Sequence, residues 1–270
     1  MEPYLIVLDL DGTLMKSFEE YDEETFEYLR KLSSDGHIIV LATGRPMRSS
    51  YFVYQALNLK TPLINYNGAR VANPLDSSYP VTDLRISRTD LLDIIEHIRP
   101  HLINVFCEII EDIYVQDYNE EIHPFLHTDG GILHSGELKD ILPGDPNGAL
   151  FFLEKDAIEY FENYIKDNYS DTLLSRFWGA GDHYIVEIYN PLVDKSVGVK
   201  DIMEYYNIPF ERTMAFGDGH NDIELFQEVN IKVAMENAHP DLKKLADYIT
   251  KTTKENGVYH FLNDYINKKA

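Results

Sequence analysis

Residues 4–14 read YLIVLDLDGTL, and this stretch decides the fold. Its first part, Tyr4–Leu8, is a continuous apolar run, which is typical of a strand that is buried on both faces of a parallel sheet. Two carboxylates, Asp9 and Asp11, follow the run directly. Neighbouring carboxylates at a sheet edge repel each other unless a cation holds them. The stretch therefore predicts a buried strand that delivers acidic side chains to a cation-binding site.

The alternation of apolar strands with amphipathic helices continues in two separate parts of the chain. Further strands are predicted over residues 37–41, 62–65, 213–216, 231–234 and 248–250. Helices are predicted over residues 22–34, 47–57, 195–206 and 240–246, and another from residue 221. Strand–helix–strand units imply parallel strands with right-handed crossovers, so we expect an α/β fold with a Rossmann-like parallel sheet.

The pattern changes between residues 83 and 189. Strands are expected here at 103–109, 112–116, 149–153, 172–177 and 183–188, with helices at 89–98 and 156–167. Paired strands beside helices indicate an open α+β layer. We therefore predict a core of residues 1–82 and 190–270, with a second, α+β domain inserted into it over residues 83–189.

The composition of the chain excludes some classes of binding partner and indicates its cellular compartment. The formal net charge of −22 would repel nucleic acid and anionic membranes, so neither is an expected partner. The single Cys107 allows no internal disulfide and fits a reducing compartment, where we expect it to be a buried small hydrophobe. The sequence contains no secretory leader and no apolar run of ~20 residues, which predicts a cytoplasmic protein.

Polar groups follow several of the predicted core strands. Thr43-Gly44-Arg45 follows the second strand, Gly217–Asp222 follows a later one, and Lys195 opens the helix after the insert. Ligands of open parallel sheets bind beyond the carboxyl ends of the strands, so we expect these groups to share one crevice.

Each group also has a simpler interpretation. Residues 9–13 could be only a turn. A calcium loop fits them badly, because the glycine comes too early. Thr43 could be a strand-end hydroxyl and Lys195 a solvated lysine, while residues 221–222 could simply cap a helix.

Taken together, the groups resemble a known family. In order, they are similar to the four motifs of the haloacid dehalogenase superfamily: Asp9–Leu14, Thr43–Pro46, Lys195 and Gly217–Asp222. Further segments resemble its Cof-type branch, the sugar-phosphatase-like members with a large α/β cap: Asn65–Ala69, Asn237–Pro240, Ala246–Thr250 and Asn256–Val258. The resemblance spans both core segments, whereas the cap matches only in placement and element pattern. It implies that residues 1–82 and 190–270 are the catalytic core and that the inserted α/β cap, residues 83–189, selects the substrate.

The resemblance implies a Mg²⁺-dependent phosphatase that acts on small phosphorylated metabolites, such as sugar phosphates, through an aspartyl-phosphate intermediate. Asp9 would be the nucleophile, and Asp11 the general acid and base. The implied metal ligands are Asp9, Asp218 and Asp11, the last through its carbonyl. The implied phosphate contacts are the amides of Leu10 and Gly44 and the side chains of Thr43, Lys195 and Asn221.

Three neighbouring residues receive weaker assignments. Asp222 would orient Lys195 or metal-bound water. Arg45 is the best candidate in the core for a substrate contact. His220 is expected to be an exposed residue near the mouth of the site rather than a base.

Alternative functions use the same groups. A phosphosugar mutase would return the phosphoryl group to a sugar, and a phospho-Asp receiver domain would only store it. A non-catalytic phosphometabolite-binding protein would lack the reaction altogether. Asp11 beside the nucleophile and the large insert favour the phosphatase.

Two cap segments contain side chains that could have a function. Residues 123–131 together with His134 are rich in His and Gly; the spacing matches no compact zinc pattern, so we expect a mobile loop near the cleft rather than a metal site. Residues 178–183 join two cap strands, either as a plain hairpin turn or as a lid contact.

Overall fold

The chain divides into two compact units, each with its own sheet. The computed structural model describes residues 2–180 and 184–269. One unit comprises Met1–Arg45, Ser50–Thr82 and Asp194–Ala270, and the other comprises Pro46–Ser49 and Asp83–Val193. Within the described ranges, no helix is both long and apolar enough to cross a membrane.

The first unit is built on an all-parallel sheet. Its strands, in spatial order, are β14 (Tyr248–Ile249), β13 (Ile231–Ala234), β12 (Thr213–Gly217), β1 (Leu5–Leu8) and β2 (Ile38–Leu41). Every residue of β1 is fully buried, because the strand has a neighbour on each edge and helices cover the sheet. The α/β class expected from the apolar runs is confirmed, and the acidic stretch extends from a central strand.

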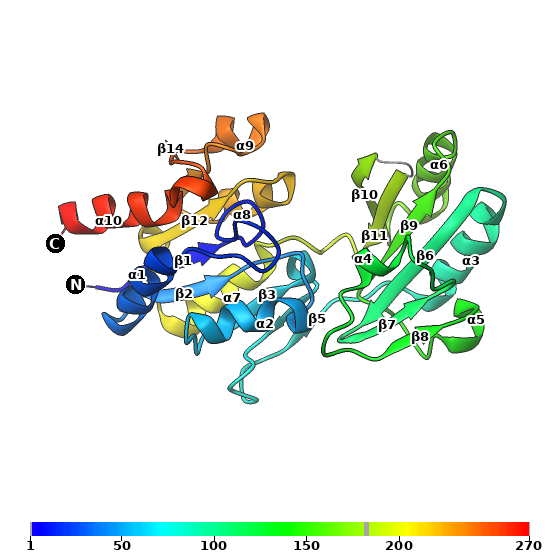
Figure 1. The fold of residues 1–270 in the computed structure, drawn as a ribbon, viewed down its shortest axis with the longest axis horizontal. Helices are drawn as coiled ribbons and strands as arrows, with labels where there is room; N and C mark the ends of the chain where they lie inside the picture. The colour runs from blue at the N-terminus through cyan, green and yellow to red at the C-terminus, as the bar shows by residue number, and fades with distance from the viewer. Residues whose placement is uncertain (1, 181–183, 270) are drawn as a thin grey trace. The chain divides into compact units, whose positions relative to one another are not determined.

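Helices lie on both sides of this sheet in Figure 1. In chain order they are α1 (Glu23–Ser34), α2 (Met47–Ala56), α7 (Val197–Tyr206), α8 (Ile223–Gln227), α9 (Pro240–Leu245) and α10 (Gly257–Lys269). Short 3-10 turns occur at Phe210–Arg212, His220–Asp222 and Thr253–Glu255. Asp22 caps α1 by accepting a hydrogen bond from the amide of Thr25 at 2.8 Å. The C-terminal helix α10 packs against α1, where Tyr28 and Tyr259 meet edge to face.

A smaller sheet follows β2 in the chain. Its strand order is β3 (Leu63–Asn65), β4 (Arg70–Ala72) and β5 (Thr82–Asp83). A 3-10 turn at Tyr66–Gly68 joins β3 to β4, with Tyr66 and Asn67 in the left-handed region. Thr43 donates its amide to the carbonyl of Ile64 at 2.9 Å, so this sheet lies beside the end of β2.

The second unit contains a mixed sheet that is antiparallel except for one parallel pair, β7 and β8. Its spatial order is β10 (Leu174–Ala180), β11 (Tyr184–Tyr189), β9 (Gly148–Leu153), β6 (Leu102–Ile109), β7 (Asp112–Val115) and β8 (Leu133–Ser135). Its helices are α3 (Arg88–Ile98), α4 (His123–Leu126), α5 (Leu138–Ile141) and α6 (Ile158–Tyr169), with a 3-10 turn at Arg99–His101. An α+β layer was expected here, and this is the fold observed.

Helices α3 and α6 cover one face of this sheet with a large apolar core. Cys107 lies in that core, as predicted, and burial raises the pKa of its thiol well above the ordinary value. A smaller cluster, which includes Phe106, Phe152 and Leu126, lies between the other face and α4.

The histidine-rich stretch of the cap is not the continuous loop that we expected, because it contains α4 and β8. His134 stacks on Tyr114 with ring centroids 4.6 Å apart, and the ring of His123 contacts the hydroxyl of Tyr118 at 2.9 Å. The connection proposed at residues 178–183 lies partly outside the described residues. Of its described part, Trp178 donates its indole N–H to Glu187 at 2.7 Å.

Candidate active site

The first unit gathers its polar side chains beyond the carboxyl ends of β1, β2 and β12. Asp9 follows β1 and donates its amide to the carbonyl of Phe216 at 3.2 Å, so β1 and β12 remain paired one residue beyond β1. Asp9, Thr43 and Lys195 are all buried. The structure therefore brings together the strand ends that were predicted to share one site.

Lys195 links two of these carboxylates. Its Nζ lies 2.6 Å from Oδ1 of Asp9 and 2.6 Å from Oδ1 of Asp222. The side chains of Lys195 and Asp222 are completely buried. Burial alone would lower the pKa of Lys195, but the carboxylates of Asp222 and Asp9 outweigh it and raise the pKa above the ordinary value. Lys195 is thus a permanent positive charge inside the site and not a solvated lysine.

Asp222 is fixed at both of its oxygens. Oδ1 contacts Lys195, and Oδ2 accepts hydrogen bonds from the amides of Asp218 at 3.0 Å and Gly219 at 2.9 Å. Asp222 therefore holds the turn that follows β12 and contacts Lys195 at the same time.

Asp218 lies beside the turn after β1. Oδ1 accepts a hydrogen bond from the hydroxyl of Thr13 at 3.3 Å, and Oδ2 accepts one from the amide of Asn237 at 3.1 Å. Gly12 has φ +80°, and a β-carbon there would lie 2.1 Å from Oδ2 of Asp218. Only glycine at position 12 leaves the Asp218 carboxylate in this place.

Asp9, Asp218 and Asp222 form a cluster of acids. Each offers one carboxylate oxygen, and these oxygens lie within 4.8 Å of one another. Burial raises the pKa of Asp9 well above 3.8, with Lys195 opposing the shift and Asp222 and Asp218 adding to it. Burial and the neighbouring Asp222 raise the pKa of Asp218 to about 6. Three clustered carboxylates exceed the charge of one lysine, so the residues present fit a divalent cation with oxygen ligands.

The Asp11 side chain points away from this cluster to Arg45. Nε of Arg45 donates to Oδ2 of Asp11 at 2.8 Å, and Nη2 contacts Oδ1. Arg45 also donates to the carbonyl of Phe18 at 2.9 Å and stacks over the Phe18 ring. The Arg45 side chain is almost fully buried, whereas Asp11 is 55% exposed. Arg45 therefore positions Asp11, a role that the sequence analysis did not give it.

The remaining predicted phosphate contacts line the same edge. The hydroxyl of Thr43 accepts the amide of Arg45 at 3.1 Å. The carbonyl of Leu10 accepts the amides of Thr13, Leu14 and Met15, which fixes the turn after Asp9. Asn221 donates to Oδ1 of Asn67 at 2.8 Å, and a β-carbon at Gly44 would lie 3.2 Å from the amide of Asn67.

Three supporting residues of the site were given no role from the sequence. Asn67 lies beside Gly44 and accepts a hydrogen bond from Asn221, and its left-handed φ of 52° explains an asparagine there. Asn237 and Thr253 both contact the carbonyl of Gly12, Asn237 at 2.8 Å. Asn67 and Asn237 lie in segments that resemble the Cof-type branch, so this resemblance was the sequence signal that could have identified these two residues.

The motifs and their geometry agree with a comparison against known families. A model of the haloacid dehalogenase-like hydrolases matches residues 6–262. The chain belongs to this family. Similarity to the Cof-type branch is thereby confirmed, and since its relatives over nearly the whole chain are named phosphatases, this haloacid dehalogenase-like hydrolase is a phosphatase.

Relatives match over nearly the whole chain. A 5-amino-6-(5-phospho-D-ribitylamino)uracil phosphatase of Bacillus subtilis is 36% identical, over 98% of each chain. A second protein of that name from the same organism is 26% identical over 97% of this chain and 95% of its own. A crystal structure from Thermotoga maritima is 28% identical, covers 97% of both chains and has a TM-score of 0.81.

Proposed function

We propose that this hydrolase removes phosphate from small phosphorylated metabolites in the cytoplasm, with Mg²⁺ as cofactor and Asp9 as nucleophile. The observation that carries the proposal is Lys195, whose Nζ lies 2.6 Å from both Asp9 and Asp222. A buried cation beside an acidic nucleophile serves to hold the oxygens of an incoming phosphate.

Asp9 and Asp218 would bind Mg²⁺, together with the backbone carbonyl of Asp11. The ion would supply positive charge to the non-bridging oxygens of the phosphoryl group. Asp222 offers the third carboxylate of the cluster, but Lys195 and two backbone amides already occupy its oxygens. Asp222 is therefore a support rather than a ligand.

In the first step a carboxylate oxygen of Asp9 attacks phosphorus and forms an acyl phosphate. The bond from phosphorus to the ester oxygen breaks, and Asp11 gives its proton to the departing alkoxide. Lys195, Thr43, Asn221 and the amides of Leu10 and Gly44 would hold the phosphoryl oxygens in line for this transfer.

In the second step water attacks the acyl phosphate. Asp11, now a carboxylate, takes the proton from that water, and Asp9 is restored as inorganic phosphate leaves. Arg45 holds both oxygens of Asp11 in the structure. Proton transfer at Asp11 therefore requires Arg45 to yield one oxygen to the leaving group and then to water.

The cap would select the substrate. Two relatives are named as 5-amino-6-(5-phospho-D-ribitylamino)uracil phosphatases, one of them 36% identical. We therefore place this phosphorylated sugar alcohol first among substrates, ahead of sugar phosphates and flavin mononucleotide.

The test is a phosphate-release assay across these compounds, in wild type and in Asp9→Asn. We expect Mg²⁺-dependent release that is abolished by chelation and by Asp9→Asn, because an amide is a poor nucleophile. Normal turnover by folded Asp9→Asn would overturn the assigned nucleophile. Transfer of phosphate to a second sugar without net release would instead identify a mutase.

A further inference from the structure

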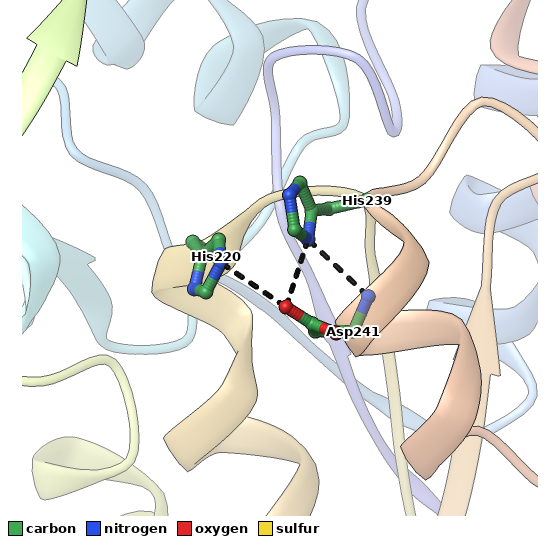
Figure 2. A group of neighbouring side chains, drawn as sticks. All are labelled: His220, His239 and Asp241. Atoms are coloured by element: carbon green, nitrogen blue, oxygen red, sulfur yellow. Dashed lines mark hydrogen bonds and ion pairs between the residues drawn. The ribbon is translucent and has the colours of Figure 1, made fainter.

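Two histidines and an aspartate meet on the surface of the first unit, outside the groups used above. His220 lies in the 3-10 turn after β12, whereas His239 and Asp241 lie at the start of α9 (Figure 2). Nε2 of His220 and Nδ1 of His239 are each 3.7 Å from Oδ2 of Asp241. The two imidazole rings are 4.3 Å apart between centroids.

We propose that His220, His239 and Asp241 form a second metal site, which binds a divalent transition-metal ion of the zinc type. Each residue offers one ligand atom, and all three atoms lie within 4.8 Å of one another. Two imidazoles with one carboxylate form a ligand set that suits Zn²⁺, whereas Mg²⁺ prefers oxygen ligands alone. The site thus differs in chemistry from the all-oxygen cluster around Asp9.

The spacing favours tetrahedral coordination. Bonds of 2.0–2.1 Å in a tetrahedron put neighbouring ligand atoms about 3.4 Å apart, whereas octahedral neighbours are about 3.0 Å apart. The observed separation of 3.7 Å is nearer the tetrahedral value, and small rotations of these exposed side chains would close the difference. Three protein ligands would leave the fourth position to water.

A neighbouring lysine, Lys244, contacts one oxygen of the Asp241 carboxylate. Nζ of Lys244 lies 2.6 Å from Oδ1 of Asp241, which leaves Oδ2 facing the two histidines. The Lys244 hydrogen bond and charge lower the pKa of Asp241 below its ordinary value, so the ligand is ionised. Such second contacts orient ligands in metal sites.

His239 also carries a lone pair on the required nitrogen. Its Nδ1 accepts the amide of Asp241 at 3.2 Å, so in this arrangement that nitrogen is unprotonated. A bound metal would take this lone pair and release the Asp241 amide to solvent. Metal binding is therefore expected to exchange the side-chain cap of α9 for a coordinate bond.

A metal ion at this site would link the two segments that contact Asp218, the turn after β12 and the segment that leads into α9. His220 lies in the turn that follows Asp218, and the amide of His239 donates to the carbonyl of Asp218 at 2.8 Å. Asn237, two residues before His239, contacts the Asp218 carboxylate. A metal ion across His220 and His239 would therefore restrict the turn that carries a proposed Mg²⁺ ligand.

The test is Zn²⁺ and Co²⁺ binding to the whole protein in excess Mg²⁺, which loads the oxygen site. The double variant His220→Gln/His239→Asn removes both imidazoles, and asparagine at 239 preserves a side-chain cap for α9. The matched control is His260→Gln, since His260 is exposed on α10 and belongs to none of the potential ligand groups found among the described residues.

We expect wild type and His260→Gln to bind one Zn²⁺ that the double variant binds at least about tenfold more weakly. We also expect the strong visible absorption of tetrahedral Co²⁺ in wild type and in His260→Gln, but not in the double variant. Zn²⁺ should raise the thermal midpoint of wild type and shift the Asp241 amide resonance. Equal Zn²⁺ affinity in the double variant, or no Zn²⁺ binding by wild type, would overturn the second site without touching the role of Asp9.

Discussion

Nζ of Lys195 lies midway between two buried carboxylates that come from distant parts of the chain, Asp9 and Asp222, at 2.6 Å from each. Lys195 neutralises part of the negative charge inside the site, and we propose that it also holds a phosphate oxygen. Removing one partner of a buried ion pair leaves the other charge uncompensated, which is far costlier than losing a surface pair.

Lys195→Met should therefore lower the free energy of unfolding by about 3–5 kcal/mol and eliminate phosphate release. Lys200→Met is the matched control, since Lys200 pairs with Glu228 at 3.0 Å but is 65% exposed, and it should cost less than about 1 kcal/mol. Urea denaturation measures both. Equal losses in the two variants would contradict the importance given to the buried cation.

Gly12→Ala tests the contact between the first turn and Asp218. A methyl group there would clash with the Asp218 carboxylate at 2.1 Å and would also strain a φ of +80°. Gly36→Ala is the control, because Gly36 has φ +98° with nothing within 4 Å, so it bears the backbone cost of about 1 kcal/mol alone. We expect Gly12→Ala to be the more destabilising and to weaken Mg²⁺ binding in calorimetry, whereas Gly36→Ala should bind Mg²⁺ as wild type does.

Asp11 and Arg45 should act as one unit. Asp11→Asn should lower kcat by about 10²–10⁴-fold through loss of the proton donor. Arg45→Gln should lower kcat less, since the carboxylate remains but is no longer held, and the double variant should be no worse than Asp11→Asn. Steady-state kinetics decide the matter: an Arg45→Gln variant with raised KM and unchanged kcat would make Arg45 a substrate contact, as first expected from the sequence.

The acid cluster predicts how stability depends on pH. The pKa of Asp218 is about 6 in the folded protein against an ordinary 3.8. The folded state therefore binds more protons than the unfolded state between these values, and the metal-free protein should lose stability as the pH rises from about 4 to about 6. Mg²⁺ competes with that proton, so stabilisation by Mg²⁺ should grow over the same range.

Urea midpoints at several pH values, with and without Mg²⁺, provide the measurement. Asp218→Asn lacks this titrating group and should make both curves less steep between pH 4 and 6. A metal-free wild type whose stability instead rises between pH 4 and 6 would show that other groups, and not the acid cluster, govern this range.

The sequence was sufficient for the five strands of the parallel sheet and their terminal side chains. The expected strand over residues 62–65, by contrast, forms β3 of the smaller sheet and pairs antiparallel with β4. Runs such as Tyr4–Leu8 are apolar throughout because parallel strands are covered on both faces, and the residue after each run marks the strand end. The order of the strands in the sheet can be predicted from this pattern only in part. β1 pairs with β12, which comes much later in the chain, and the apolar runs do not specify which distant strand becomes its neighbour.

Other features had a weak signal or none. The C-terminal helix α10 was not predicted, although Val258, Leu262 and Ile266 recur every fourth residue and are buried. The strand β4 has only three residues, too few to show a period. The Arg45–Asp11 contact could not be foreseen, because the direction of a long side chain depends on its packing, here on the ring of Phe18.

The pairing of β1 with β12 has a consequence for how the molecule forms. The ribosome must synthesise the chain as far as Gly217 before the central strand β1 can pair with its second neighbour, β12. Asp9 likewise contacts Lys195 across a separation of 186 residues. The segment Asp83–Val193, by contrast, is continuous and has its own apolar core. Since distant contacts form slowly, the inserted unit is expected to fold first during synthesis, and the residues of the candidate active site come together only after it.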